Sequence, residues 1–243
     1  DDDVALATVM WANNEVGSLQ PVRELARVAR QAGIPVHVDA VAALGQTPID
    51  AHAAGVSALS VSAHKIGGPV GVGALVLSRE TQAEPLLHGG SGSDSLLQLM
   101  PEYLPDRLEA GTHNVCGIAG LRAGIDFVTE RGLNNIFSHE QRLTKLMEER
   151  LEGSGLELFC GRAGEQCGVL SVRHGGIDSE TLSGALAEKG VCVRAGLHCA
   201  PTAHESAGTL ETGTVRFSFS AFTTEKQVLE ACAALRGVCR ELL

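Results

Sequence analysis

The feature that most constrains the fold of this chain is the alternation, in its first half, of short apolar runs with segments of helical periodicity. Runs typical of strands occur at 4–11, 36–38, 57–62 and 72–78. Helical spacing occurs at 22–31 and 49–54. Strands that alternate with helices favour a mainly parallel sheet with helices on its faces, because parallel neighbours need a crossover connection. The first half is therefore predicted to be an α/β structure.

The second half has a different rhythm, and an aperiodic segment at 91–108 precedes it. Helical spacing is found at 118–129, 138–152, 179–189 and 224–243, and strand patterns at 156–159, 169–172, 191–193 and 215–220. Asp178 suits the N-cap of the helix at 179–189, Gly190 suits its end, and Ser138 suits the cap region of the second helix. We predict an α/β fold with a large domain at 1–130 and a smaller α+β domain at 131–243.

Composition excludes several classes of partner. The net charge is −10, from 19 Lys+Arg against 29 Asp+Glu, which opposes binding to nucleic acid. No apolar stretch is long enough to cross a membrane, so no membrane partner is expected. The seven cysteines are an odd number without a CxxC pair, which predicts no metal site and reduced thiols in a cytoplasmic protein. Six of them are expected to be small buried residues, with Cys199 as the exception.

The start of the sequence is unusual, because the acidic run Asp1-Asp2-Asp3 leads directly into the strand pattern at 4–11. No initiator methionine and no signal-peptide pattern precede this strand. We therefore expect the sequence to be part of a longer protein.

The segment at 62–65 carries the first candidate chemistry. Lys65 follows an apolar strand and lies beside Ser62 and His64, two side chains that can bind an anion. A lysine at the carboxyl end of a strand can form a Schiff base with a carbonyl cofactor. Asp39, at the end of another strand, can pair with a protonated pyridine nitrogen. The alternatives are a surface lysine and an aspartate that caps a turn or helix.

Three segments together resemble the cofactor half of cysteine desulfurases and selenocysteine lyases, pyridoxal-phosphate enzymes of fold type I related to class V aminotransferases. They are WANNEVG at 11–17, HVDA at 37–40 and SAHK at 62–65, in the same order and spacing. The resemblance implies that 1–130 belongs to an incomplete large domain of this fold and that the cofactor is pyridoxal 5′-phosphate.

Residue roles follow from the same resemblance. Lys65 would be the Schiff-base lysine, and Asp39 the partner of the pyridine nitrogen. Ser62 and His64 would bind the cofactor phosphate. Asn14 would lie near the phenolic oxygen of the cofactor and the carboxylate of the substrate.

The segment VRAGLHCAP at 193–201 resembles the catalytic-cysteine loop of one desulfurase branch. His198 and Arg194 give Cys199 an electropositive setting, which favours the thiolate. The resemblance implies that Cys199 attacks the sulfur of cofactor-bound L-cysteine, keeps it as a persulfide and releases L-alanine. A structural thiol is the alternative for Cys199.

Two further segments resemble the family. In GTLETGTVRFS at 208–218, Arg216 would bind the substrate carboxylate, and Arg194 is counted with it as substrate-binding. In RLEAGTHN at 107–114, Thr112 would reach the cofactor phosphate of a neighbouring subunit, which implies a homodimer.

Three departures from the family pattern stand out. Ala42 occupies the position of a glutamine that bonds the cofactor oxygen, and His113 replaces a proline. The family's N-terminal portion, with a phosphate cup and a histidine that stacks on the cofactor, is expected to be missing.

Several functions remain open on the sequence. A class V aminotransferase or a selenocysteine lyase would have the same fold, and a non-catalytic fragment or degenerate homologue is the alternative from another class. A desulfurase would pass its sulfur to an acceptor protein, such as an iron–sulfur cluster scaffold or a small sulfur carrier.

Overall fold

The computed structural model describes residues 3–94, 96–161 and 164–243, so Asp1, Asp2 and Ser95 of the segments discussed above lie outside the described residues. The chain divides into two compact units. The first comprises Asp1–Thr8, Arg23–Val41 and Asp50–Phe127. The second comprises Val9–Val22, Ala42–Ile49 and Val128–Leu243.

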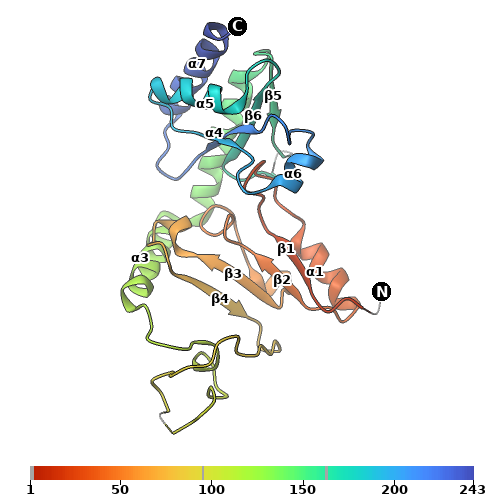
Figure 1. Cartoon of the computed structure of the whole chain (residues 1–243), viewed down its shortest axis with the longest axis vertical. Coiled ribbons are helices and arrows are strands. Elements are labelled where there is room, and N and C mark those ends of the chain that lie inside the picture. The colour runs from red at the N-terminus through yellow and green to blue at the C-terminus, as the bar shows by residue number, and fades with distance from the viewer. Residues whose placement is uncertain (1–2, 95, 162–163) are drawn as a thin grey trace. The chain divides into compact units, whose positions relative to one another are not determined.

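A four-stranded sheet of order β1-β2-β3-β4 runs through the first part of the chain (Figure 1). Its strands are β1 (Ala7–Met10), β2 (Val36–Asp39), β3 (Ala58–Ser62) and β4 (Gly73–Leu77). β2 and β3 are parallel, with Val38 opposite Leu59, and β4 runs antiparallel to β3. The helices α1 (Val22–Gln31) and α2 (Ala51–Ala54) lie between strands in the chain. The α/β fold is therefore confirmed, with a mixed sheet.

Local signals explain these elements. α1 has the bounds that its apolar spacing predicts. α2 begins after Asp50, whose side chain accepts a hydrogen bond from the backbone N–H of Ala53 and so satisfies one of the free donors of the first turn. The strand predicted from residue 4 begins only at Ala7, because residues 3–6 are exposed and have no buried face.

After β3 the chain forms a short 3₁₀ helix, η1 (Ala63–Ile66), which carries Lys65. The long helix α3 (Val115–Arg131) packs against it through two glycines one turn apart. A Cβ at Gly124 would lie 2.7 Å from the carbonyl oxygen of Ile66, and a Cβ at Gly120 would lie 2.5 Å from Cδ of Pro69. These glycines let the helix backbone approach the lysine turn closely.

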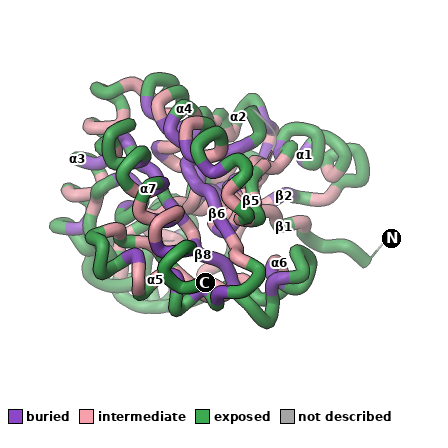
Figure 2. Tube along the Cα trace, turned by 90° about the horizontal axis from the view of Figure 1, so that it is seen from above, coloured by how far each residue is buried: buried purple, intermediate pink, exposed green. Residues whose placement is uncertain are grey.

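The second unit contains an antiparallel sheet of order β5-β6-β8-β7, formed by β5 (Leu156–Phe159), β6 (Val169–His174), β7 (Arg194–Gly196) and β8 (Thr214–Ser218). Its helices are α4 (Leu133–Leu151), α5 (Ser179–Glu188), α6 (Pro201–Ser206) and α7 (Glu225–Glu241). Buried side chains of β6 meet those of α4 and α7 in one apolar core, and β6 is purple in Figure 2. This is the α+β arrangement expected for the second half.

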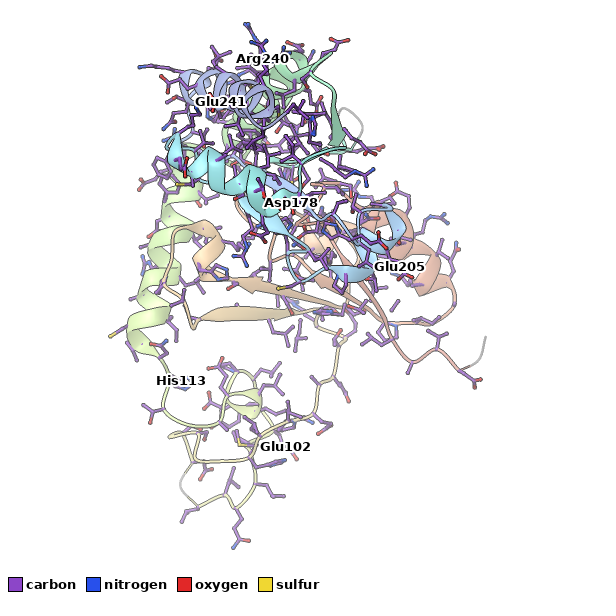
Figure 3. The ribbon with its side chains drawn as sticks, turned by 45° about the horizontal axis from the view of Figure 1, so that its top comes forward. Glu102, His113, Asp178, Glu205, Arg240 and Glu241 are labelled. Carbon is purple, nitrogen blue, oxygen red and sulfur yellow. The ribbon has the colours of Figure 1, made fainter. Side chains whose placement is uncertain are left out.

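Helix caps in this unit follow the sequence. Asp178, labelled in Figure 3, accepts a hydrogen bond from the N–H of Thr181. The side-chain and then the backbone hydrogen bond of Thr181 lower the pKa of its carboxyl. Gly190 adopts φ 78° just beyond the end of α5. Thr224 and Gln227 form a complete capping box for α7.

Three expectations for this unit were wrong or incomplete. The strand expected at 191–193 lies at Arg194–Gly196, because the backbone N–H of Val191 still bonds Leu186 O at the end of α5. Ser138 lies inside α4, which already begins after Gly132. The helix α6, which begins with Pro201, had not been predicted.

The cysteines also differ from expectation. Cys167, Cys232 and Cys239 are buried as predicted, whereas Cys116, Cys160 and Cys192 are exposed together with Cys199. The apolar spacing that marks a helix does not say which of its cysteines lies on the covered side.

Within the described ranges, no helix is both long and apolar enough to cross a membrane.

Candidate active site

Two of the predicted cofactor-binding positions leave the sheet of the first unit at the same edge. β2 and β3 are parallel and pair Asp39 with Ser60, so that Asp39 ends one strand next to the end of the other at Ser62. The backbone N–H of Val41 donates to Oδ1 of Asp39 over 2.8 Å and holds the carboxylate at this edge. The carboxyl ends of parallel strands are where open α/β sheets bind ligands.

The turn after β3 presents three polar side chains. Oγ of Ser62 and Nδ1 of His64 are 2.8 Å apart, and His64 and Lys65 are both exposed. Ala63 and Ile66, on either side of this pair, are buried and fix the turn. The first unit thus brings together a carboxylate, a hydroxyl, an imidazole and a primary amine. This donor set fits pyridoxal phosphate: an acid for the pyridine nitrogen, two phosphate ligands and an amine for the aldehyde.

In the second unit, a tight loop after β1 carries Asn14 and Glu15. Oδ1 of Asn13 accepts hydrogen bonds from the N–H groups of Glu15 and Val16, over 2.8 Å and 3.0 Å, and so closes the turn. Gly17 follows with φ 71°, and a Cβ there would lie 2.7 Å from the carbonyl oxygen of Val169. Only glycine permits this loop to press against β6.

Glu15 is the centre of a buried polar cluster. Its carboxylate is 2% exposed, forms hydrogen bonds with three side chains and has a fourth nearby. Nδ2 of Asn14 donates to Oε1 over 2.5 Å, and an Nη of Arg216 lies 3.2 Å from the same oxygen. Nδ1 of His198 donates to Oε2, and Nε2 of His204 lies 3.5 Å from Oε2. One carboxylate therefore contacts residues from three segments that are far apart in the sequence.

The cysteine loop follows β7 directly. Cys199 is exposed and has φ 68°, and His198 before it has φ 48°. Non-glycine residues with positive φ are uncommon, and these are the two such residues within the described ranges. The side chain of His198 is nevertheless only 2% exposed, and its Nε2 donates to the carbonyl oxygen of Arg194 over 3.0 Å. The loop therefore holds a buried histidine beside an exposed thiol.

Arg216 and Arg194 lie opposite each other in the pairing of β8 with β7. Directly opposite residues of an antiparallel pair share one face of the sheet, so two positive side chains start from neighbouring positions. An Nη of Arg216 donates to the carbonyl oxygen of Asn14 over 2.8 Å, whereas its buried Nε has no hydrogen-bond partner among the described atoms. Like charges at directly opposite positions repel each other, and an anion bound by both guanidinium groups would offset this repulsion.

The remaining predicted positions have few polar contacts. Thr112 is exposed in the segment after η2 (Asp106–Leu108), and Nδ1 of His113 lies 2.8 Å from Oε2 of Glu109. Ala42 packs against a small apolar cluster that contains Ala12 and Ala43. The amide of Asn14, expected near the cofactor, donates to Glu15.

Sequence reasoning missed Glu15 and His204. Glu15 stands within the 11–17 segment, and its charge in a segment bounded by apolar residues is a weak signal of a buried function. His204 falls in the unpredicted helix α6, only five residues after Cys199. Neither residue stands out without the fold.

The carboxylate of Glu15 and the two imidazoles offer ligand atoms within 4.8 Å of one another, a donor set that transition metals favour. However, the guanidinium of Arg216 already lies 3.2 Å from the same carboxylate and supplies the compensating charge. A further cation would be repelled by it. The geometry therefore favours a hydrogen-bonded ion cluster.

The fold and the site define an α/β protein with an exposed lysine turn at strand ends and, in its second unit, two arginines on neighbouring strands and an exposed cysteine in the loop after one of them. The profile of the aminotransferase class-V family matches residues 1–230. The chain belongs to this family.

Within this family, the chain is similar to several cysteine desulfurases among the curated relatives and the solved structures. The chain is 41% identical over 152 residues to the IscS-like cysteine desulfurase of Mycobacterium tuberculosis, which covers 63% of this chain and 35% of that protein. It is 34% identical to a cysteine desulfurase of Klebsiella pneumoniae, over 98% of this chain and 59% of that protein. The apo structure of cysteine desulfurase from Thermococcus onnurineus NA1 matches with a TM-score of 0.89 and 30% identity, over 98% of this chain and 59% of that one. The chain thus spans between about a third and three fifths of the length of these relatives.

Proposed function

We propose that this chain is part of a pyridoxal-phosphate-dependent cysteine desulfurase that converts L-cysteine to L-alanine and keeps the sulfur as a persulfide on Cys199. The observation that carries the proposal is the pairing of β7 with β8. It sets Arg194 opposite Arg216, and the loop that leaves β7 exposes the thiol of Cys199. Two arginines on neighbouring strands and a nucleophile in the loop after one of these strands suit an amino-acid substrate that must give up its sulfur.

The residues at the strand ends of the first unit would hold the cofactor. Lys65 would bind its aldehyde, Asp39 its pyridine nitrogen, and Ser62 and His64 its phosphate. When bound, pyridoxal phosphate supplies an electron sink for the substrate's Cα, which makes the bond between Cβ and sulfur breakable. Lys65 is exposed, so its amine is accessible to a carbonyl compound.

Arg216 would bind the substrate carboxylate. Its side chain is 21% exposed although its Nε is buried, and a bidentate guanidinium–carboxylate pair fixes both position and orientation. Arg194 would add the second positive charge on the same face of the sheet. Asn14 would stay a neighbour of this site, because its carbonyl oxygen accepts a hydrogen bond from Arg216.

Cys199 would accept the sulfur as a thiolate. A new S–S bond forms to Sγ while the bond between Cβ and sulfur of the substrate breaks. The electron pair of the broken bond stays on the carbon, which takes up a proton and leaves as alanine. The exposure of Cys199 then allows the persulfide to meet an acceptor.

The wider organisation is part of the same proposal. Residues 1–130 would serve the cofactor and residues 131–243 the sulfur transfer. Thr112, exposed in the first unit, would complete the cofactor site of a second subunit in a homodimer. The protein would act in the cytoplasm and pass its sulfur to an iron–sulfur cluster scaffold or a sulfur carrier.

The test is a comparison of Cys199→Ala with Cys192→Ala, an exposed cysteine close by in the sequence, in the full-length protein loaded with pyridoxal phosphate. Cys199→Ala should abolish the release of sulfide and alanine from L-cysteine but keep the cofactor absorbance. Cys192→Ala should behave as the parent. Borohydride reduction followed by peptide mapping should place the cofactor on Lys65.

Each alternative gives a different result. Unchanged alanine formation by Cys199→Ala would refute the role of this thiol and favour an aminotransferase. A strong preference for selenocysteine over cysteine would indicate a selenocysteine lyase. An adduct on another lysine would refute the assignment of the cofactor site, and the absence of any adduct would favour a non-catalytic homologue.

A further inference from the structure

The buried carboxylate of Glu15 has no place in the roles assigned above, although it has more polar contacts than any of the proposed catalytic groups. It contacts Asn14 of its own loop, Arg216 of β8, and His198 and His204 on either side of Cys199. A carboxylate that is 2% exposed is costly unless charged and polar groups compensate it. The contacts with these surrounding residues therefore fix the position of the carboxylate.

The backbone of the cysteine loop needs contacts that stabilise its conformation. His198 and Cys199 both adopt left-handed conformations, which side-chain-bearing residues avoid. Consecutive residues in this region persist only where surrounding contacts impose them. The contacts that hold His198 are its two ring nitrogens, one on Glu15 and one on the carbonyl oxygen of Arg194.

The groups around His198 show which atoms its two ring nitrogens bond. A carbonyl oxygen accepts and cannot donate, so Nε2 carries the proton of the bond to Arg194. Nδ1 faces Oε2 of Glu15, and the other oxygen of this carboxylate accepts bonds from Asn14 and Arg216. The bond between His198 and Glu15 therefore joins a basic to an acidic side chain, both 2% exposed.

We propose that Glu15 is a positioning residue that anchors the Cys199 loop through His198 and, with its other oxygen, holds Arg216. The two oxygens of one carboxylate thereby join the loop of the sulfur-accepting cysteine to the arginine for the substrate carboxylate. This inference rests on the proposed function for the roles of Cys199 and Arg216, while the anchoring itself rests on contacts alone. His204 borders the carboxylate, and its Nδ1 is 2.7 Å from Oγ1 of Thr209.

The test uses Glu15→Gln in the full-length protein, with Glu205→Gln as the matched control. Glu205 lies on α6, next to His204 in sequence, and is exposed (Figure 3). The first readout is the rate of tryptic cleavage after Arg194, followed by mass spectrometry, because this exposed bond precedes the loop. Glu15→Gln should speed this cleavage by about tenfold or more, the effect of losing a charge-assisted hydrogen bond.

The second readout is kinetic. Glu15→Gln should lower kcat for persulfide formation by about tenfold or more while the cofactor adduct on Lys65 forms as in the parent. Loss of desulfurase activity in the parent itself would refute the proposed function, and the cleavage readout would still decide the anchoring. Cleavage within about twofold of the Glu205→Gln control would refute the anchor.

A second variant keeps the inference testable if Glu15→Gln does not fold. His198→Asn removes the bond between His198 and Glu15 but leaves Glu15 with Arg216, and asparagine tolerates the left-handed backbone. Both single variants should speed cleavage, and the double variant should do no more than either, because both remove the same contact. Additive effects would refute the shared contact. If the purified protein contained stoichiometric zinc and chelation sped the cleavage, the cluster around Glu15 would be a metal site, and the proposed anchor would be refuted.

Discussion

The most quantitative prediction concerns Glu140, a glutamate buried on α4. It is 2% exposed, and its Oε2 has no hydrogen-bond partner among the described atoms. A Cβ at Gly168, the residue before β6, would lie 2.6 Å from this oxygen, which shows how closely the backbone there approaches it. Burial disfavours the charged form and raises the pKa of Glu140 from 4.5 to about 8.

The sign of the effect on stability follows from the proton count. Below pH 4.5 the carboxyl is protonated in the folded and the unfolded chain alike. Between pH 4.5 and about 8 the folded chain keeps a proton that the unfolded chain has released. The free energy of unfolding should therefore fall as the pH rises through this window, by roughly 1.4 kcal/mol per pH unit from this group.

Glu140→Gln removes the titration while keeping the shape of the side chain. The free energy of unfolding of the variant, relative to the parent, should rise by about 2–3 kcal/mol between about pH 5.5 and about pH 7.5. Urea unfolding followed by the fluorescence of Trp11 measures it, because Trp11 is the one tryptophan of the sequence and belongs to the same unit as Glu140. The exposed Glu149→Gln on the same helix is the control. A difference between parent and Glu140→Gln that stays constant across this range would refute a protonated Glu140.

Three further predictions address binding, reactivity and packing. Arg216→Lys should raise KM for L-cysteine by about tenfold to a hundredfold with a smaller effect on kcat, because lysine cannot form the bidentate pair, and steady-state kinetics measure it. Cys160 is exposed but partly desolvated by its surroundings, and this desolvation together with the charge and hydrogen bond of Glu148 raises the pKa of its thiol to about 11. Cys160 should therefore alkylate slowly with iodoacetamide near pH 8, and Glu148→Gln should speed the reaction. Gly124→Ala should lower the free energy of unfolding by about 1–3 kcal/mol, because its Cβ would meet the carbonyl oxygen of Ile66 at 2.7 Å.

Controls and refuting outcomes differ among these three. If Arg216→Lys and Arg216→Glu both changed kcat by as much as they changed KM, that result would argue against carboxylate binding. Equal alkylation rates of Cys160 and Cys116, which are both exposed, would refute the raised pKa of the Cys160 thiol. Gly184→Ala in α5, where nothing lies within 4 Å of the added Cβ, should instead stabilise by up to about 1 kcal/mol. Destabilisation by Gly184→Ala would contradict the packing explanation for Gly124.

Elements with strong local signals were predicted well. α1 has its predicted bounds, and α5 begins after Asp178 as expected, because a cap and an apolar face act over a few residues. The short strand β7 was misplaced by three residues, because its position depends on pairing with β8 and not on its own apolar residues. The helix α6 was missed, because five of its six residues are polar or proline and carry no apolar stripe.

The predicted roles of Lys65, Asp39, Ser62 and His64 came from a resemblance, and the contacts of these residues are compatible with it. They remain predictions until the adduct is mapped. Of the second unit, the sequence pointed to Cys199 and Arg216 but gave no sign that Glu15 connects them.

The sequence by itself determined most of the strands and helices, the candidate nucleophile and the candidate lysine, because periodicity, caps and short motifs are encoded by neighbouring residues. Only the tertiary structure decided which of the seven cysteines are exposed and that Glu140 is buried without a full set of partners. It alone placed Glu15 against His198, 183 positions away in the sequence. Such contacts depend on how strands and loops pack, and no local pattern records which residues the packing brings together.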